Sequence, residues 1–474
     1  MSPPTPANPK RTAAAVLLTT ADPADPQIYL VERSPELRFF GGYWALPGGT
    51  RGPEDGPDDS TSGDRAALLR CAVRELEEET AVRVATGDLS EVCRIETPPF
   101  APVRYDTLFV LGTLPQWQKP RVTPGELVQG RFWRPKEALQ EWRKGKLLIV
   151  PPVLVLLELI VKHGLQAAML EAASELAEGY RRGKLHRVRF APGILMASVL
   201  SPTLPPATTT NCYVVGEERL YVIDPGTHDK GETERLCVLL DELVAEGRKL
   251  EAILLTHHHP DHIGAVNPLS ERFHLPVHAH PLTHARIRAG YRVGRSLADG
   301  DCLPLGRSPD GQDGWQLAAV FTPGHDRGHL CFRESRYASV IAGDMLSTVS
   351  TIVIDPPEGH LVTYLHSLER MLAEPMGTLH PAHGPAARDG HRVVRQYLRH
   401  RSQRETALVQ ALAEGPADIA DLVPKIYWEI DASMHPIAAR SLLAGAEKLA
   451  EEGRARQRPD GLWELSSSRA APSP

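Results

Sequence analysis

The chain has 474 residues, of which 42% are hydrophobic and 24% charged, so it is too long for one ordinary core and too apolar to be disordered throughout. Its formal net charge of −6 excludes a chain that is basic overall, and any nucleic-acid surface must therefore be local. Six cysteines lie far apart without CxxC pairs, which is typical of the reducing cytosol rather than of a secreted disulfide framework. We therefore expect a cytoplasmic protein of two or three globular domains.

The first zone of the chain, residues 11–183, is predicted to be an α/β domain. Residues 1–10 lack the apolar stretch of a signal peptide and are expected to form a disordered leader. The expected elements of the zone are strands over 12–20 and 27–32, a polar loop over 48–63, a helix over 64–80, strands over 105–111 and 131–133, and helices up to residue 182.

The most apolar segment of the chain covers residues 147–161. Pro151, Pro152 and Glu158 interrupt it, and it is too short to cross a bilayer. We predict a buried helix here and no contact with a membrane.

The second zone, 184–390, alternates short strands with a few helices, and Gly and Pro separate them. This pattern favours a layered αβ domain over a helical bundle. The last zone, 391–468, begins as a helix with several arginines and ends in two short strands over 453–465 around Pro459-Asp460-Gly461. Helices followed by a small hairpin indicate a winged-helix module.

The segment 257–262 concentrates potential metal ligands directly after a buried strand predicted over 250–255. The ligand-type residues of this segment are His257, His258, His259, Asp261 and His262. Imidazole and carboxylate groups suit a borderline-soft dication such as zinc. Even four of them exceed what one tetrahedral ion uses while it keeps a position open for water, so we predict a two-metal site.

Further ligand-type residues follow apolar strands elsewhere in this zone. Each lies beside Gly or Pro on the loop after its strand: Asp224, His325, Asp344, His380 and His383. Loops at strand ends that converge on one edge of a sheet sandwich would form a metal pocket.

This series of motifs resembles the metallo-β-lactamase superfamily over roughly residues 188–388, which implies an αββα sandwich. The resemblance assigns His257, His259 and His325 to one ion, and Asp261, His262 and His383 to the other. Asp344 bridges the two ions in this assignment, and Asp224 orients ligands without binding metal. Two Zn²⁺ ions, or iron or manganese, would hold a bridging hydroxide that attacks a carbonyl carbon or a phosphorus atom, and Asp261 is counted among the catalytic residues.

Other histidines of the zone are expected to do something else. His258 alternates away from the metal-facing residues, so we predict a structural role for it. His278, His280 and His284 crowd one segment but are not expected to bind metal. His329 and His380 either face the substrate or fill positions behind the ligands.

Four further sequence features resemble one branch of the superfamily. The run Thr208–Val215, the loop His325-Asp-Arg-Gly-His329, the pair His400-Arg401 and the terminal module resemble the β-lactamase-like protein 2 group. That group includes endoribonucleases of single-stranded RNA and fungal thiohydrolases that release acyl chains. The loop 325–329 is also similar to that of glyoxalase-II-type thioesterases. The arginines after His391 either contact phosphates or form a solvated face.

A second constellation joins Leu46-Pro47-Gly48-Gly49 to the segment Arg74–Val82. On a helix, Glu75, Glu78 and Glu79 share one face, where three carboxylates repel one another unless a cation neutralises them. Oxygen ligands suit Mg²⁺ or Mn²⁺. For the glutamates alone, a solvated acidic face explains the pattern equally well.

Together with Pro-Gly-Gly, this segment resembles the Nudix hydrolase box, which implies an α/β/α fold that cleaves diphosphates. The resemblance implies that Glu75, Glu78 and Glu79 bind the metal ion and that Glu78 and Glu79 are catalytic. It also implies that Arg74 stabilises the helix by ion pairing. The departures from the box are Ala66 in place of a Glu eight residues before the Arg, Ser60 in place of Gly, a longer loop, and Ala81 in place of the final Gly. The run Leu30–Leu37 resembles the branch that acts on coenzyme A and its esters, and Glu126 is either a further acid or a surface residue.

The leading hypothesis is a metal-dependent hydrolase of a small-molecule thioester or a phosphodiester, joined to a Nudix hydrolase of coenzyme A derivatives or other nucleoside diphosphate-type substrates. The alternative is a single-strand endoribonuclease with a non-catalytic Nudix-like sensing or docking domain. The sequence specifies neither the substrate nor the oligomeric state.

Overall fold

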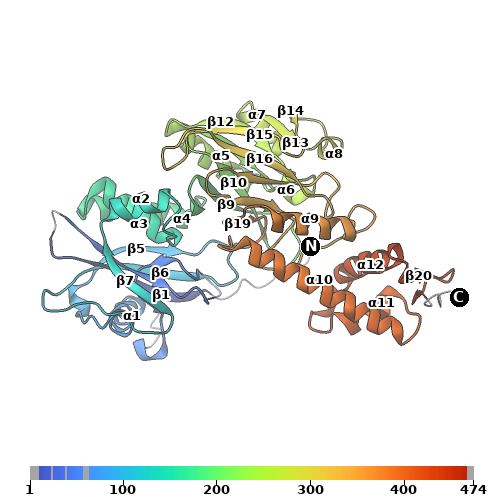
Figure 1. Cartoon of the computed structure of the whole chain (residues 1–474). Helices are drawn as coiled ribbons and strands as arrows, with labels where there is room; N and C mark the ends of the chain where they lie inside the picture. The colour runs from blue at the N-terminus through green and yellow to red at the C-terminus, as the bar shows by residue number, and fades with distance from the viewer. Residues whose placement is uncertain (1–9, 23–24, 38–39, 57–62, 467–474) are drawn as a thin grey trace.

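The computed structural model describes residues 10–22, 25–37, 40–56 and 63–466. The leader predicted over 1–10 lies outside these ranges except for Lys10, and so does the middle of the loop predicted over 48–63. An N-terminal unit, a central unit and a C-terminal module follow one another along the chain (Figure 1). Within the described ranges, no helix is both long and apolar enough to cross a membrane.

The N-terminal unit is a mixed sheet between helices. Its strand order is β3-β2-β1-β6-β5, with β1 parallel to β6, while β4 pairs with β1 and β7 pairs with β2. Helix α1 covers one face and α2, α3 and α4 pack on the other, so the central strand β1 is almost wholly buried. The elements are β1 (Arg11–Thr19), β2 (Ile28–Arg33), β3 (Trp44–Ala45), β4 (Gly48–Thr50), η1 (Pro53–Asp55), α1 (Gly63–Thr80), η2 (Thr86–Asp88), β5 (Ser90–Glu96), β6 (Tyr105–Thr113), β7 (Leu127–Trp133), α2 (Pro135–Arg143), α3 (Pro151–His163) and α4 (Ala167–Arg181).

The helix predicted over 147–161 begins only at Pro151. Proline has no amide hydrogen to donate, so it suits the first turn of a helix and not its interior. The residues before it extend instead, and Ile149 bridges Trp44 beside the sheet.

The central unit has two sheets packed face to face with helices outside both, which confirms the predicted αββα sandwich. The first sheet has the order β14-β13-β12-β11-β10-β9-β8 and the second the order β15-β16-β17-β18-β19. Helices α5 and α7 cover the first sheet, and α9 and the start of α10 cover the second. The elements are β8 (Val188–Ala191), β9 (Ile194–Leu200), β10 (Thr209–Val215), β11 (Arg219–Ile223), α5 (Lys230–Ala245), β12 (Lys249–Leu254), α6 (Pro260–Ile263), α7 (Val266–Arg272), β13 (Pro276–Ala279), α8 (Pro281–His284), β14 (Arg292–Ser296), β15 (Cys302–Gly306), β16 (Trp315–Phe321), β17 (Leu330–Glu334), β18 (Val340–Gly343), α9 (Leu361–Ala373) and β19 (Leu379–Pro381).

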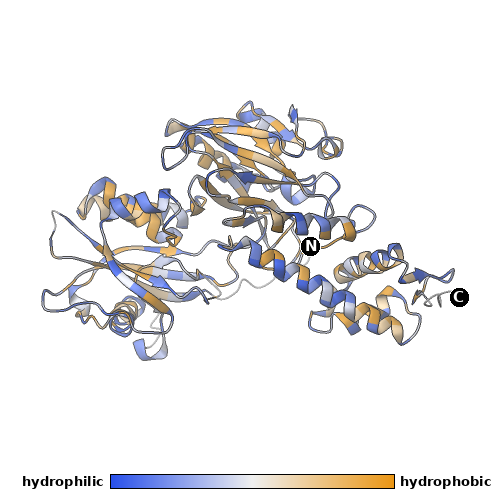
Figure 2. Cartoon of the chain, in the orientation of Figure 1, coloured by the Kyte–Doolittle hydropathy of each residue, from blue (hydrophilic) through white to orange (hydrophobic). Residues whose placement is uncertain are grey.

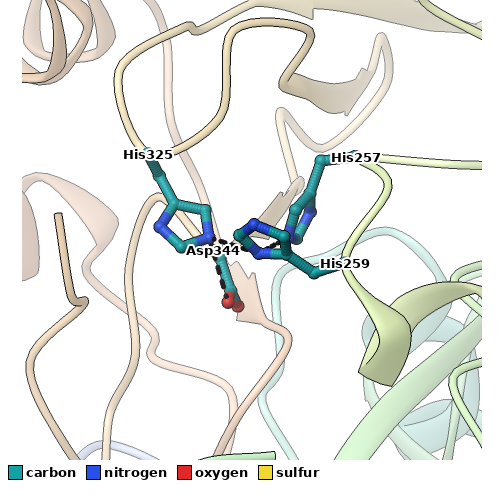
Figure 3. A group of neighbouring side chains, drawn as sticks. All are labelled: His257, His259, His325 and Asp344. Carbon is teal, nitrogen blue, oxygen red and sulfur yellow. Dashed lines mark hydrogen bonds and ion pairs between the residues drawn. The ribbon is translucent and has the colours of Figure 1, made fainter. Parts of the chain in front are cut away.

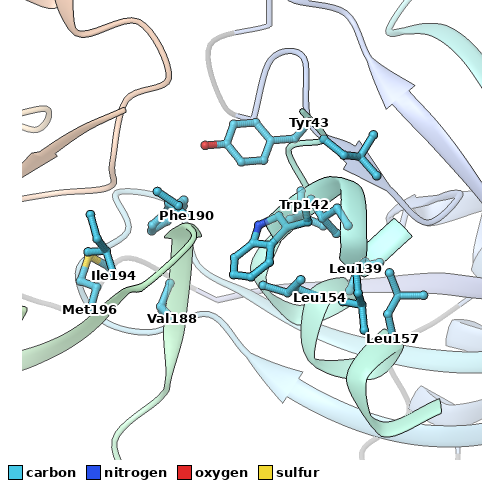
Figure 4. Packing of buried hydrophobic residues seen from close by; sticks show 14 of the residues in the cluster. Tyr43, Leu139, Trp142, Leu154, Leu157, Val188, Phe190, Ile194 and Met196 are labelled. Atoms are coloured by element: carbon cyan, nitrogen blue, oxygen red, sulfur yellow. The ribbon is translucent and has the colours of Figure 1, made fainter. Parts of the chain in front are cut away.

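One apolar core runs from the N-terminal unit into the central unit. Figure 4 shows Trp142 and Leu154 of the N-terminal helices facing Phe190 of β8, and all three side chains are buried in a single cluster. The Arg189 guanidinium pairs with the Glu158 carboxylate at the edge of this contact. Buried hydrophobic residues therefore fill the space between the two units. Figure 2 shows hydrophobic segments on the helices and strands of both units.

The C-terminal module is built on a helix that it shares with the central unit. The first half of α10 (Gly390–Ala413) packs on the second sheet, and its second half packs on α11 and α12. In Figure 1 this helix leads from beside α9 to the module. The remaining elements are α11 (Ile419–Ile426), η3 (Ala432–Met434), α12 (His435–Glu451), β20 (Ala455–Gln457) and β21 (Trp463–Leu465). The hairpin β20–β21 completes the predicted winged-helix arrangement.

Candidate functional site

Four loops bring the ligand-type side chains of the central unit to one edge of its sandwich. The first follows the buried end of β12 and leads into α6, and the second joins β16 to β17. The other two follow β18 and β19, which are neighbours in the second sheet. The sequence therefore places each cluster residue where a buried strand ends, and the packing of the two sheets brings the loops together.

The first group is made of three imidazoles and a carboxylate that converge (Figure 3). His257 Nε2 lies 2.9 Å and His325 Nε2 lies 3.0 Å from the same atom, Nδ1 of His259. His325 Nε2 also lies 3.5 Å from Asp344 Oδ2. In His257 and His325 the other ring nitrogen, Nδ1, faces an oxygen outside the group. His257 Nδ1 lies 2.9 Å from Thr256 Oγ1, and His325 Nδ1 donates to the carbonyl of Val353. The inner nitrogens thus carry lone pairs that point at one another.

The second group contains Asp261, His262 and His383. His383 Nε2 lies 3.5 Å from Asp261 Oδ2 and 3.3 Å from Asp344 Oδ1, and its Nδ1 donates to the carbonyl of Thr209. His262 Nε2 lies 3.6 Å from Asp344 Oδ1. Asp344 therefore borders both groups, one carboxylate oxygen toward each.

Asp224 lies beneath the two groups and touches both. Its carboxylate accepts hydrogen bonds from the backbone and hydroxyl of Thr256 and from Nδ1 of His262, over 2.8, 2.6 and 2.8 Å. Through Thr256 it also fixes the ring of His257. The residue is buried and its backbone has a φ of 51°, a left-handed conformation that costs a non-glycine residue about 1–2 kcal/mol. The left-handed backbone conformation at Asp224 thus directs its carboxylate toward Thr256 and His262.

The charges of the cluster are unbalanced without a cation. Burial lowers the pKa of His383, but Asp344 and Asp261 outweigh burial and raise it to about 10. Burial and the neighbouring imidazoles lower the pKa of His259 to about 3. His262 Nε2 and Asp344 Oδ1 are buried without a hydrogen-bond partner. Convergent lone pairs, orphaned polar atoms and a set of nitrogen and oxygen donors fit divalent cations, which replace the protons that the site otherwise takes up.

The remaining histidines lie outside these two groups. His258 forms a third group of potential ligands with His259 and Asp326. Its Nδ1 lies 2.5 Å from the buried carboxylate of Asp326, which ties the loop after β12 to the loop after β16. His329 accepts a hydrogen bond from the backbone of Asp344 and contacts the Thr322 hydroxyl. His329 and His380 are fully buried and neither lines the cavity beside the cluster, so both fill positions behind the ligands. In the described part of the chain, His278, His280 and His284 belong to no metal-binding group.

A cavity of about 620 Å³ opens beside the two groups and reaches the C-terminal module. Near the cluster it is lined by His259, Asp261, His325, Asp344 and His383. Much of its far wall is apolar and comes from the module, through Tyr427, Ile430, Met434, Ile437 and Ala438. Sequence reasoning missed this wall, because the module's residues carry no ligand-type motif and reach the cluster only through the path of α10.

The acidic side chains of α1 form a less compact site. Glu79 Oε2 accepts a hydrogen bond of 2.9 Å from the Gly48 amide, and burial together with the Glu75 and Glu126 charges raises its pKa to about 7. Glu75 and Glu78 are instead ion-paired to Arg74, each over 3.0 Å, and Glu78 is largely exposed. In the described ranges no three of these carboxylates lie within 4.8 Å of one another. The helix thus holds the acids on one face without bringing three of their carboxylates together in the part of the chain that the structure describes.

The structure also supplies the acid that the box lacks at Ala66. Asp55 of η1 is buried and grips Arg74 with both carboxylate oxygens, over 2.9 Å to Nε and 2.8 Å to Nη2. In the usual box the Glu lies six residues after the Gly, which places these two residues at positions 60 and 66 when they are counted back from Arg74. Asp55 lies at the same interval of six residues after Gly49. The departure is therefore an insertion after the acid and not a loss of the acid.

Ala81 ends α1 in the left-handed region, with a φ of 58°, at the position where the box normally has Gly. Its amide still donates to the carbonyl of Glu77 and closes the helix. The turn is kept at the cost of backbone strain.

Comparison with known proteins agrees with this architecture. A model of the metallo-β-lactamase superfamily matches residues 205–388, a NUDIX domain model matches 9–151, and a β-lactamase-associated winged helix domain model matches 419–463. An uncharacterised protein of Aquifex aeolicus is 30% identical over 187 residues, which is 36% of this chain and 81% of that protein. The chain belongs to the metallo-β-lactamase superfamily. Its metallo-β-lactamase domain follows a NUDIX domain, and both are hydrolase domains.

Named relatives match about half of the chain. A β-lactamase-like protein 2 homolog of Drosophila melanogaster is 27% identical over 261 residues, or 52% of this chain and 84% of that protein. An atrochrysone carboxyl ACP thioesterase of Claviceps purpurea is 29% identical over 266 residues, or 52% of this chain and 79% of that protein. The structure of a β-lactamase domain protein from Burkholderia ambifaria, 22% identical with a TM-score of 0.50, covers 59% of this chain and 93% of that chain. That structure supports the fold alone.

Proposed function

We propose that the metallo-β-lactamase domain hydrolyses a small-molecule thioester with two divalent metal ions. His257, His259 and His325 would hold one ion, Asp261, His262 and His383 the other, and Asp344 would lie between them. Bound dications of the zinc type make hydroxide available at neutral pH and neutralise charge that develops on the scissile carbonyl. The convergence of the two groups at the end of one cavity is the observation that carries this proposal.

The chain's own residues set the conditions for the reaction. Asp224, Thr209 and the Val353 carbonyl fix which nitrogen of each ring faces inward. Asp261 lines the cavity beside His383. Its carboxylate would therefore lie between the proposed metal ion and a substrate in the cavity. The apolar far wall excludes water from the other end of a bound substrate.

The shape of the cavity favours a thioester over RNA. A pocket of about 620 Å³ with an apolar wall suits a small molecule, whereas single-stranded RNA is bound along open basic grooves with aromatic platforms. The exposed Arg392, Arg395 and Arg399 lie on the face of α10 opposite to its buried side, which carries Tyr397 and Arg401. The relative named as an ACP thioesterase supports the same choice.

A substrate panel tests this proposal. Acyl thioesters and single-stranded RNA are offered to the wild-type protein, with and without a chelator, and to Asp261→Asn. We expect metal-dependent thioester hydrolysis that falls at least 100-fold in Asp261→Asn. Asp241→Asn, which removes a surface charge paired to Arg272, is the matched control and should keep full activity. Cleavage of RNA without turnover of any thioester would support the endoribonuclease instead.

For the NUDIX domain we propose Mg²⁺- or Mn²⁺-dependent cleavage of a diphosphate, with coenzyme A derivatives as the first candidates. The observation in favour is the pairing of Asp55 with Arg74, which keeps the supporting ion pair of the box. Glu78→Gln and Glu79→Gln should abolish diphosphate cleavage and leave thioester hydrolysis intact. If neither substitution changes any activity, the domain only binds its ligand.

We also propose the cytosol as the compartment of the protein. All six cysteines are free and five of them are buried, so no disulfide depends on an oxidising environment.

A further inference from the structure

The wall of the cavity that α10 contributes is cationic. His400, Arg401 and Arg404 occupy one turn of the helix, and all three line the cavity that also holds the metal-binding groups. Arg440 of α12 lines it as well. The charge on this wall belongs to the inner face of the helix and is separate from its exposed arginines.

Two of these arginines are already neutralised. Arg404 forms an ion pair with Glu429 and donates to the carbonyl of Ile426. Arg440 pairs with Asp355 over 3.0 Å. Their positive charges are therefore balanced without a bound ligand.

Arg401 differs because it is buried and has no counter-charge among the residues that the structure describes. It is 8% exposed, and in the described part of the chain no carboxylate lies within 4 Å of its guanidinium. One of its amino groups donates to the carbonyl of Ile352, its carbon lies 5.4 Å from the centre of the Tyr364 ring, and its Nε has no partner. A buried cation without an anion is costly to the fold.

His400 adds a second donor without an acceptor. Its Nε2 lies 3.3 Å from Nε of Arg404, which can only donate, so Nε2 must accept. The ring hydrogen is then on Nδ1, and this atom is buried without a partner. Burial and the neighbouring Arg401 and Arg404 charges also lower the pKa of His400 to about 4, so the ring is neutral at pH 7.

We propose that the α10 wall of the cavity binds an oxyanion, carboxylate or phosphate, that the substrate carries in addition to the bond that is hydrolysed. The inference rests on the proposed hydrolysis in the same cavity and narrows its substrate class to anionic thioesters. A guanidinium binds either oxyanion through two parallel hydrogen bonds, and an anion here would neutralise Arg401. The oxyanion lies at the end of the acyl group or on the thiol.

Matched thioesters distinguish the two sources. The first is a neutral acyl group on N-acetylcysteamine, the second ends the same acyl chain in a carboxylate, and the third carries the neutral acyl group on phosphopantetheine. We expect one of the two anionic substrates to have a kcat/KM at least tenfold above the neutral one. In Arg401→Met this preference should disappear through a rise in KM, while the neutral substrate is hydrolysed as before. Arg401→Lys should restore part of the preference.

The control is Arg395→Met, which removes an exposed arginine from the other face of α10 and should keep the full preference. If Arg401→Met does not fold, His400→Phe keeps the apolar volume of the ring and removes the Nδ1 donor, and it should lower the preference. A preference that survives both substitutions, or a wild-type protein that favours the neutral substrate, overturns the proposal.

A binding measurement separates this inference from the hydrolysis itself. Inorganic phosphate or succinate should raise the melting temperature of the metal-free wild-type protein and leave that of Arg401→Met unchanged. If no thioester is hydrolysed but this difference is found, the proposed reaction is wrong and the oxyanion site stands. Equal stabilisation of the two proteins shows that the anions bind elsewhere and overturns the site.

Discussion

Replacing Asp224 by Asn tests whether the carboxylate beneath the cluster orients the metal-binding rings. Asp224 accepts three hydrogen bonds, from the amide and hydroxyl of Thr256 and from Nδ1 of His262. An asparagine has one acceptor oxygen, and its amide nitrogen has to face at least one of these donors. If it faces His262, the ring takes its hydrogen on Nε2 and loses the lone pair directed at Asp344.

The size of the effect follows from this loss of orientation. Removing the partner behind a metal-binding histidine weakens metal affinity roughly 10- to 100-fold, or about 1.4–2.7 kcal/mol. One buried donor left without an acceptor costs the metal-free protein about 1–3 kcal/mol of unfolding free energy. The binding of the ion proposed for the Asp261, His262 and His383 group should be weakened more than that of the other proposed ion, because the group of His257 contacts Asp224 only through Thr256.

The assay is a competition titration of the metal-free protein with Zn²⁺ and a chromophoric chelator, alongside urea unfolding. Glu334→Gln is the control, because this acid is equally buried and accepts from Trp315 Nε1 and the Ser339 amide, far from the cluster in the hydrogen-bond network. It should lower stability and leave zinc affinity unchanged. Wild-type zinc affinity in Asp224→Asn, or an equal loss in both variants, would refute the reasoning.

Three further predictions concern stability. Ala81→Gly should raise the unfolding free energy in urea by about 0.5–1 kcal/mol, since glycine relieves the left-handed strain at φ 58°, and a decrease would contradict this. Trp142→Ala should cost roughly 3–5 kcal/mol and lower the melting of both domains together, whereas loss of the NUDIX transition alone would show that the shared core is not cooperative. Burial of His186, which stacks on Tyr180, lowers its pKa from 6.5 to about 4, so protonation favours the unfolded chain. As the pH falls from 6.5 to 4, the wild type should lose about 3 kcal/mol that His186→Gln does not lose, and parallel pH profiles of the two proteins would count against it.

The sequence identified the central cluster because its chemistry is local. Each candidate ligand follows a buried strand within a few residues, and a sandwich brings such strand ends to one edge. Asp344, for example, follows β18 and meets His383 after the neighbouring strand β19. The partners of Asp224, which are Thr256 and His262, needed coordinates, since these contacts depend on a left-handed turn at a non-glycine residue.

Other features lay beyond sequence reasoning for a physical reason. Asp55 pairs with Arg74, but an insertion separates the two residues in the sequence. The usual spacing counted back from Arg74 therefore ends at Ala66, whereas the usual spacing counted forward from Gly49 ends at Asp55. The cavity wall is set by where α10 carries the C-terminal module, and no local pattern encodes that direction. The lack of a counter-charge at Arg401 is a property of its three-dimensional neighbours.

The continuous apolar core between the NUDIX and metallo-β-lactamase domains limits how the protein can be divided into fragments. A fragment that contained either domain alone would leave Trp142 or Phe190 uncovered in water, and we expect such fragments to aggregate. Because one buried cluster holds side chains of both domains, the NUDIX domain and the metallo-β-lactamase domain pack directly against each other.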